Sequence, residues 1–139
     1  ITGEIIDSLV LSLQDKAIPM ATLMAKNKDI SSLIDPHIVK VIVDKNSQAL
    51  YFSRSPIPHG ASDFFFQHIG IYGFQKDFLL NFRSMARSRL EKIENLEQLR
   101  AIENGFRIKM VEIPFPSLSV DTPQDIIKVE ERLKNRDHE

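Results

Sequence analysis

The sequence predicts an α/β domain in which helices flank a mixed sheet. Segments with strand character alternate with segments of helical periodicity along the chain. Two β-rich runs, 38–43 and 49–53, are separated by only five residues, so they are expected to form an antiparallel hairpin within that sheet. A length of 139 residues, 42% hydrophobic residues and a net charge of −1 are typical of one soluble globular domain.

The first elements are a helix and a strand. Thr2 can cap a helix that runs to about Gln14. Its inner face is expected to carry the four apolar residues at helical spacing, Ile5, Ile6, Leu9 and Leu13. The apolar run from Pro19 to Met24 has the length of a strand, and a polar stretch follows from Lys26. This order predicts a helix packed on a sheet.

The hairpin is followed by a stiff loop and an aromatic run. Pro56 and Pro58 exclude the segment after Ser53 from the interior of a sheet. Phe64, Phe65 and Phe66 then begin a new apolar run. We expect these rings to divide between the core and a second apolar surface, which could serve a subunit contact.

The run from His68 to Phe74 is predicted to be a strand that displays its polar rings on one face. In an extended strand His68, Gly70 and Tyr72 point the same way. One interpretation is structural, with a core histidine hydrogen-bonded to a carbonyl and a tyrosine packed at the edge. The alternative is a binding surface, because Gly70 removes a side chain and lets a ligand approach the backbone.

A short helix at 76–82 is expected next, and then one longer helix from Ser88 to Gly105. Ser88 and Glu91 have the spacing of a capping box, and Gly105 lies where a helix would end in the left-handed region. Within this helix a buried stripe is predicted from Leu90, Ile93 and Ala101.

Glu97 falls in the middle of that predicted stripe, where a carboxylate is costly. It either pairs with a basic neighbour such as Arg100 or faces a cleft, with Gln98 beside it, and binds a polyhydroxylated ligand. The residues alone leave both interpretations open.

The C-terminal part is predicted to contain a strand at 107–113 and a last helix from Thr122 to about Lys134. Pro123 suits the first helical position. Asp121 lies just before this helix N-terminus, where the dipole keeps a carboxylate ionised. It could simply cap the helix, but Thr122 can do so instead, which leaves Asp121 free as a metal ligand.

Several classes of partner and location are disfavoured. No block of Lys and Arg marks a nucleic-acid or membrane surface, and no apolar run approaches the roughly 20 residues that span a bilayer. The absence of cysteine suits a reducing cytoplasm, which is the expected location. Because the first residue is Ile1, we expect the chain to be part of a longer protein.

Four segments together resemble one enzyme family. They are Tyr-Phe-Ser-Arg at 51–54, His-Ile-Gly-Ile-Tyr-Gly-Phe at 68–74, Leu-Glu-Gln-Leu-Arg at 96–100 and Val-Asp-Thr-Pro at 120–123. In this order and at this spacing, they resemble the 3-deoxy-manno-octulosonate (Kdo) cytidylyltransferases, also called CMP-Kdo synthetases. Four ordered segments are a specific signal, although each alone is weak.

The resemblance implies a fold, a reaction and a set of partners. The fold is the second half of a nucleotide-diphospho-sugar-transferase-like α/β/α domain, without the N-terminal nucleotide-binding half. The reaction activates Kdo with CTP to give CMP-Kdo and pyrophosphate for lipopolysaccharide biosynthesis, and the expected assembly is a homodimer. We expect the chain to be the sugar-binding and dimerisation half, inactive alone. The alternatives are an enzyme of the CMP-sialic acid type and a non-catalytic dimerisation fragment.

The resemblance also assigns site residues. Asp121 corresponds to a catalytic aspartate that binds magnesium. The sugar side comprises five residues, Arg54, His68, Tyr72, Glu97 and Gln98. For Arg54 a second role stays open, in which an ion pair braces the loop that contains Pro56 and Pro58.

Overall fold

A five-stranded mixed sheet forms the centre of the molecule. The computed structural model describes residues 2–114 and 123–136. Its strands are β1 (Met20–Asn27), β2 (Lys40–Val43), β3 (Ala49–Ser53), β4 (Phe65–Phe74) and β5 (Ile108–Ile113), in the order β3-β2-β4-β1-β5. β5 is parallel to β1, while β4 is antiparallel to β1 and β2 is antiparallel to both β3 and β4. The predicted mixed α/β sheet and its hairpin are therefore confirmed.

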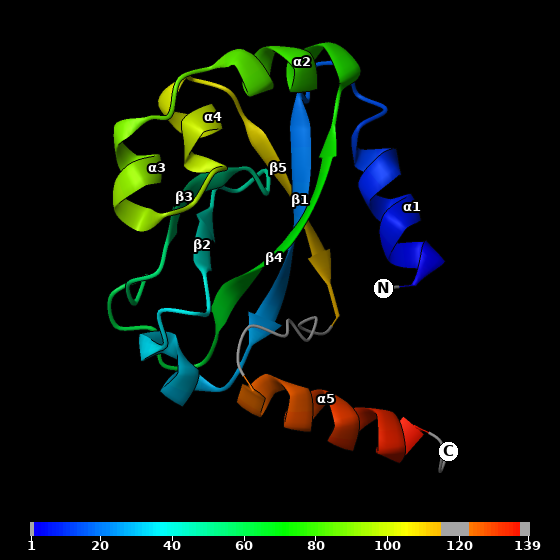
Figure 1. Ribbon diagram of the computed structural model, residues 1–139, viewed down its shortest axis with the longest axis vertical. Coiled ribbons are helices and arrows are strands. Elements are labelled where there is room, and N and C mark those ends of the chain that lie inside the picture. Colours follow the sequence, from blue (N-terminus) through cyan, green and yellow to red (C-terminus); the bar gives the residue numbers. More distant parts are fainter. Residues whose placement is uncertain (1, 115–122, 137–139) are drawn as a thin grey trace.

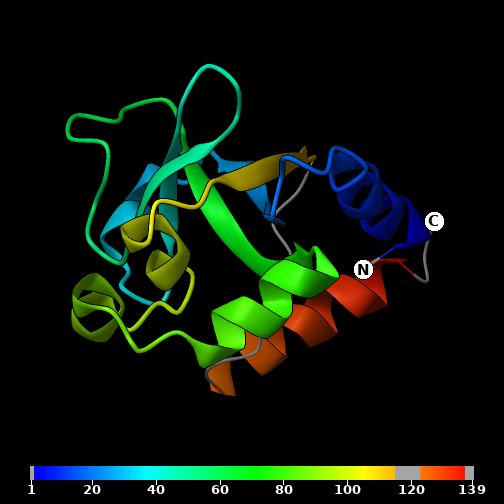
Figure 2. The same cartoon turned by 90° about the horizontal axis from the view of Figure 1, so that it is seen from above.

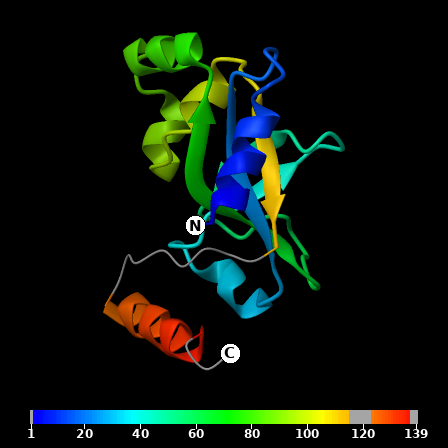
Figure 3. The same cartoon turned by 90° about the vertical axis from the view of Figure 1, so that its right-hand side faces the viewer.

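Helices cover both faces of this sheet (Figures 1 and 3). On one face lies α1 (Gly3–Ser12), and on the other lie α2 (Lys76–Ser84), α3 (Arg89–Glu94) and α4 (Leu99–Glu103). The view from above separates α1 from the group of α2, α3 and α4 (Figure 2). The sheet and these four helices thus form a three-layer α/β/α arrangement.

The alternating side chains of β1 divide the interior into two cores. Ala21, Leu23 and Ala25 face α1 and pack with Ile5 and Leu9. Met20 and Met24 face the other way, into a larger core built with α2, α4 and the hairpin. Because β1 pairs with β4 as far as Asn27, and with β5 as far as Ala25, it extends beyond the predicted end at Met24.

The α1 layer differs from the prediction at one residue. Ile5 and Leu9 are buried as expected, and Leu13 packs against the same core. Ile6 is half exposed, so its assignment to the inner face was wrong. The contact between α1 and the sheet is close at Gly73, where a Cβ would lie 2.6 Å from Leu13 Cδ1.

The segment from Ser88 to Gly105 is not one helix. Ser88 and Glu91 form the predicted capping box, in which Glu91 Oε2 accepts the Ser88 backbone N–H at 3.0 Å. The helix α3 then stops at Asn95, which is left-handed with φ 54° and ψ 50°. The chain re-enters a helix only at Leu99, so the predicted residues do not form one continuous stripe. Ala101 is buried and Leu90 partly buried as expected, but Ile93 is 64% exposed, so its assignment was wrong. Gly105 ends the segment as expected, with φ +80°.

The aromatic run at the start of β4 is largely internal. Phe65 is buried, Phe66 packs partly buried against the larger core, and Phe64 lies edge-on to Phe66. Lys26 Nζ lies 5.1 Å from the centroid of the Phe64 ring. A subunit contact through these rings stays a prediction.

The last helix, α5 (Pro123–Arg136), begins at the predicted proline and lies at the end of the sheet opposite α2 (Figure 1). The predicted metal ligand, Asp121, and the predicted cap, Thr122, fall outside the described residues. Within residues 2–114 and 123–136, no helix is long and apolar enough to cross a bilayer.

Candidate functional site

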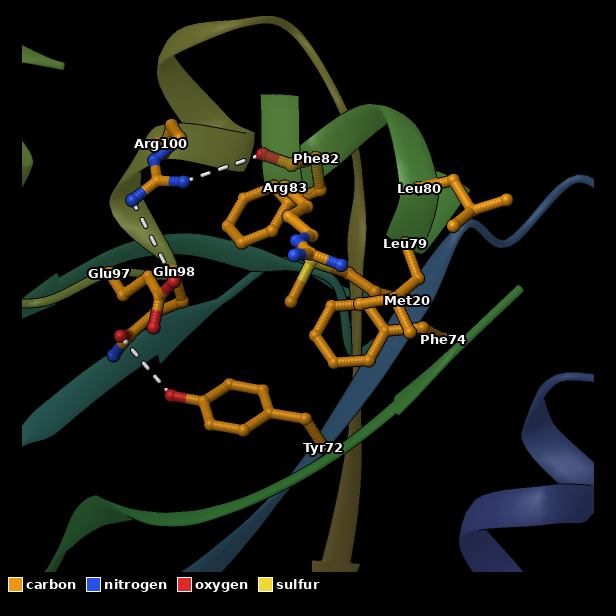
Figure 4. A pocket seen from close by; sticks show the side chains of 10 residues that line it. All are labelled: Met20, Tyr72, Phe74, Leu79, Leu80, Phe82, Arg83, Glu97, Gln98 and Arg100. Atoms are coloured by element: carbon orange, nitrogen blue, oxygen red, sulfur yellow. Dashed lines mark hydrogen bonds and ion pairs between the residues drawn. The ribbon is translucent and has the colours of Figure 1, made fainter. Parts of the chain in front are cut away.

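A cavity of about 460 Å³ opens between β4, α2 and the start of α4. Figure 4 shows the ten side chains that line it: Met20, Tyr72, Phe74, Leu79, Leu80, Phe82, Arg83, Glu97, Gln98 and Arg100. Apolar side chains, most of them from α2, form one wall of the cavity, and Arg83 of α2 lies among them. The opposite side, which we call the polar wall, is formed by Tyr72, Glu97, Gln98 and Arg100. Three of the predicted sugar-side residues, Tyr72, Glu97 and Gln98, therefore meet at one cavity.

The polar wall begins with a hydrogen bond between β4 and α4. Tyr72 Oη lies 3.2 Å from Gln98 Oε1, and an amide oxygen only accepts, so the phenol donates. Gln98 is 3% exposed, and its Nε2 lies 3.5 Å from His68 Nδ1. The His68 ring lies 5.6 Å from the Tyr72 ring on the same strand face, as the alternation predicted. His68 does not line the cavity itself but supports the residues that do.

Thr22 completes this chain of hydrogen bonds and fixes its direction. Thr22 Oγ1 lies 2.7 Å from the carbonyl oxygen of Ile71 and 2.9 Å from His68 Nε2. A hydroxyl has one proton, and a carbonyl can only accept it, so Thr22 donates to Ile71 and accepts from His68. His68 therefore carries its proton on Nε2 and presents Nδ1 to the Gln98 amide.

Both rings of this chain are uncharged near pH 7. Desolvation lowers the pKa of His68 to about 4, so the imidazole is neutral near pH 7. Burial, together with the nearby Glu97 carboxylate, raises the pKa of Tyr72, so the phenol stays protonated. The polar wall thus offers the cavity a neutral phenol oxygen with free lone pairs, beside one carboxylate.

That carboxylate, Glu97, is exposed rather than buried. Its side chain is 70% exposed, and Oε1 lies 3.6 Å from Arg100 Nη2, as the pairing interpretation predicted. Glu97 also lines the cavity, as the cleft interpretation predicted, so the two are compatible. The helix break before residue 97 explains the error in burial, because it changes which side chains face the sheet.

The buried carboxylate of this segment is Glu91, which sequence reasoning treated only as a cap residue. Its Oε1 and Oε2 accept from Arg100 Nη2 and Nε at 2.6 and 2.9 Å. The Arg100 hydrogen bonds hold the pKa of Glu91 down at about 2. Arg100 also lies over the Phe82 ring, 4.8 Å from its centroid. This pair anchors α4 to α3 and holds Arg100 at the cavity wall.

Arg54 lies away from the cavity, at the junction of β3 and α3. Its guanidinium donates to the carbonyl oxygens of Pro36, Glu94 and Asn95, at 2.9, 2.8 and 3.2 Å. These contacts fit a bracing role, although they are hydrogen bonds to carbonyls rather than the predicted ion pair. The assignment of Arg54 to the sugar side stays a prediction, and the cations that line the cavity are Arg83 and Arg100.

The described residues do not by themselves provide a metal centre. Among residues 2–114 and 123–136, no three or more His, Asp or Glu side chains gather where they could hold an ion. The donor that the sequence predicts, Asp121, lies outside this part of the chain. An ion bound by Asp121 would therefore need further ligands, such as phosphate oxygens, beyond those that the described residues offer.

Sequence reasoning missed two residues on which the polar wall depends. Thr22 was assigned only to a short apolar strand, and Arg100 only to a possible partner of Glu97. A buried threonine within an otherwise apolar strand is a usable signal, because its hydroxyl needs a partner. The Glu91–Arg100 pair is nine residues apart and could not be found without knowing where α3 ends.

Comparison with known proteins gives one consistent result. A family model described as cytidylyltransferase matches residues 1–111. The 3-deoxy-manno-octulosonate cytidylyltransferase of Syntrophotalea carbinolica is 47% identical over 133 residues, which cover 87% of this chain and 53% of the relative. The protein of the same name from Solibacter usitatus is 43% identical over 134 residues, which cover 93% of this chain and 53% of the relative. The chain thus spans about half the length of the curated relatives it matches.

A solved structure agrees with these relatives. It is CMP:2-keto-3-deoxy-manno-octonic acid synthetase complexed with CTP, which matches with a TM-score of 0.88 and 34% identity. The match covers 98% of this chain and 58% of that one. The similarity therefore extends over the whole sheet and the helices around it.

Proposed function

The chain belongs to the cytidylyltransferase family, and we propose that it forms the sugar-acid side of a Kdo cytidylyltransferase. The proposed reaction joins Kdo to the cytidine monophosphate part of CTP and releases pyrophosphate, as a cytoplasmic step of lipopolysaccharide biosynthesis. The similarity to relatives of that name supports the substrate pair. The observation that carries the proposal is the convergence of Tyr72, Gln98 and Glu97 on one cavity.

The cavity has the chemistry that a polyhydroxylated acid requires. Glu97 can accept hydrogen bonds from two sugar hydroxyls, and the Tyr72 oxygen can accept another while it donates to Gln98. Arg83 and Arg100 line the same cavity and can neutralise a sugar carboxylate. The apolar wall from α2 can contact the carbon face of the sugar ring.

In the proposed reaction the chain binds and orients the sugar. The anomeric hydroxyl oxygen of Kdo forms a bond to the α-phosphorus of CTP, the bond from that phosphorus to pyrophosphate breaks, and the hydroxyl proton is lost to a base. Such phosphoryl chemistry depends mainly on alignment and charge neutralisation. We propose magnesium as the ion that would neutralise phosphate charge, with Asp121 as one of its ligands.

Direct titration with Kdo tests the sugar site. We expect Kdo added to the ¹⁵N-labelled chain to shift the resonances of Tyr72, Gln98 and Glu97, and N-acetylneuraminic acid to shift them less. Tyr72→Phe removes the hydroxyl and should weaken binding, whereas the exposed Leu50→Ala on β3 serves as the control. Stronger binding of N-acetylneuraminic acid would favour the CMP-sialic acid type. Shifts confined to residues away from the cavity would contradict the proposed site.

A turnover assay tests the division of labour. We expect the chain mixed with CTP, Kdo and magnesium to release no pyrophosphate, because it matches only about half of its relatives' length. Clear turnover by this chain alone would contradict that expectation. In an enzyme that contains this chain and turns over, Asp121→Asn should abolish the activity, and a near-normal rate would remove Asp121 from the metal site.

The second candidate is a dimerisation role, and the outer face of α1 favours it. Ile6, Val10 and Leu11 on this helix are each at least half exposed, which is an unusual grouping of apolar side chains on one short helix. We propose that a second copy of the chain packs on this face. Sedimentation should show a dimer that Val10→Glu converts to a monomer, and a monomeric wild-type chain would contradict this role.

A further inference from the structure

The residue that holds the sugar side in place lies outside the cavity, at the last turn of α3. We propose that Glu94 is a positioning residue, whose contacts with β3 end α3 early and thereby present Glu97 and Gln98 to the cavity. The inference rests on the proposed function for its ligand, but its structural part is independent of that function.

The Glu94 carboxylate is the common acceptor of three donors, two from β3 and one from Arg54, the residue that follows it. Its Oε1 accepts from Ser53 Oγ at 2.7 Å and from Tyr51 Oη at 3.2 Å. Its Oε2 accepts from the Arg54 backbone N–H at 2.9 Å. Three polar groups at one strand edge, two side chains and one amide, are thus satisfied by one carboxylate. Such charge-assisted bonds are stronger than neutral ones.

Arg54 also binds the end of α3 through its side chain, and we call Glu94 together with its partners Tyr51, Ser53 and Arg54 the clamp. Its Nε donates to the Glu94 carbonyl and its Nη2 to the Asn95 carbonyl, at 2.8 and 3.2 Å. In a continuing helix these carbonyls would accept from N–H groups four residues onward. The guanidinium takes that place and satisfies the orphaned acceptors at the helix end.

The clamp explains why the segment is not one helix. Residues on both sides of the break favour helix, and the segment between the Ser88 cap and Gly105 contains no proline or glycine. A left-handed residue other than glycine is uncommon, although asparagine tolerates it best. Contacts from β3 therefore supply the free energy that holds Asn95 at φ 54°.

The break in turn decides where the cavity residues point. After Asn95 the chain turns so that Gln98, immediately before α4, reaches Tyr72 while Glu97 lines the cavity. If α3 continued through Asn95, the side chains at 97 and 98 would be displaced along and around the helix axis. The same strand also supports the other partner, because Phe52 packs edge-on against His68 with centroids 4.9 Å apart. The segment Tyr51–Arg54 is therefore the support of the sugar side.

Two variants test this role, one that changes the acceptor of the clamp and one that removes two of its donors. Glu94→Gln keeps the shape of the side chain but replaces one acceptor oxygen with an amide that cannot accept. The double variant Tyr51→Phe with Ser53→Ala leaves Glu94 intact and removes two of its donors. The control is Glu112→Gln on β5, whose exposed carboxylate lies 3.8 Å from Lys26 Nζ and does not line the cavity.

The first measurement is structural and requires no ligand. In both clamp variants we expect the ¹³Cα shift of Asn95 to lose its left-handed signature and the Gln98 side-chain amide resonances to move, while thermal unfolding stays cooperative. The control should leave both unchanged. Unchanged Asn95 and Gln98 resonances in folded clamp variants would overturn the proposal, whether or not the chain binds Kdo. If Glu94→Gln fails to fold, the double variant decides.

The second measurement connects the clamp to the ligand. We expect the dissociation constant for Kdo to rise about tenfold or more in both clamp variants, since displaced hydrogen-bonding groups lose much of their contribution to binding. An unchanged dissociation constant in variants whose Gln98 resonances have moved would overturn the link to sugar binding. If the wild-type chain binds no Kdo, the proposed function fails at this step, and the structural measurement still decides the role of Glu94.

Discussion

The two faces of the sheet are packed with different kinds of side chain. On the α1 face, β1 presents Ala21, Leu23 and Ala25, which pack with Ile5 and Leu9 of α1. On the opposite face, the same strand presents Thr22 between Met20 and Met24, and hydrogen-bonded polar groups are buried among the apolar ones. The cavity lined by Tyr72, Glu97 and Gln98 lies on this second face. The polar interior therefore lies on the face that carries the proposed sugar site, which we call the functional face, while the apolar interior holds the layers together.

The largest expected effect comes from the buried ion pair on the functional face. Arg100→Met leaves the Glu91 carboxylate buried and without its main partner, which should lower the free energy of unfolding by about 3–5 kcal/mol. Adding Glu91→Leu should recover much of that loss, because two apolar residues can replace a buried pair. Urea unfolding of the single and double variants measures both values. A single variant as stable as wild type would show that the pair is not effectively buried.

The second effect is a dependence of stability on pH, which buried groups on the functional face produce. Because burial lowers the pKa of His68 from 6.5 to about 4, the unfolded chain takes up this proton before the folded one does. The free energy of unfolding should therefore fall by about 3 kcal/mol as the pH falls from about 6.5 to 4. Glu91 adds a second loss below about pH 4.5, since its pKa is lowered to about 2. His68→Gln should flatten the first part of a pH series of urea midpoints and leave the second part in place.

The functional face also shows what the sequence could and could not predict. Alternation correctly placed His68 and Tyr72 on one face, although β4 contains an irregularity between Ile69 and Tyr72. The prediction survived because the irregularity adds two residues, Gly70 and Ile71, to β4, and an even number preserves the alternation. Periodicity is therefore a reliable guide within a single strand.

The helix break could not be predicted in the same way. Capping signals correctly marked both ends of the segment from Ser88 to Gly105, because caps depend on residues close in sequence. The break at Asn95 depends on Tyr51, Ser53 and Arg54, about 40 residues earlier. Local helix propensity does not depend on such distant contacts, so the sequence predicted one continuous helix. That error placed Glu97 among core residues, whereas its side chain is exposed.

The third effect tests the apolar face. Leu9→Ala removes a buried side chain between α1 and β4 and should lower the free energy of unfolding by about 2–3 kcal/mol. Because no residue of this core lines the cavity, the dissociation constant for Kdo should not change while the protein stays folded. Urea unfolding and a Kdo titration on the same sample check both parts. A change in Kdo affinity would show that the two faces are coupled through the sheet.

The smallest expected effect on stability comes from Thr22, on the functional face. Here we expect the opposite of the Leu9 result, namely a small loss of stability together with weaker binding of Kdo. Thr22→Val keeps the volume of a fully buried side chain but removes the hydroxyl that accepts from His68 and donates to Ile71. Stability should fall by only about 1–2 kcal/mol. The imidazole loses the group that fixes its proton on Nε2, so its contact with Gln98 weakens, and Kdo should bind less tightly. The imidazole ¹⁵N shifts, which distinguish the two tautomers, provide the decisive measurement. A tautomer and a Kdo affinity both unchanged by this substitution would show that the polar interior contributes to packing alone.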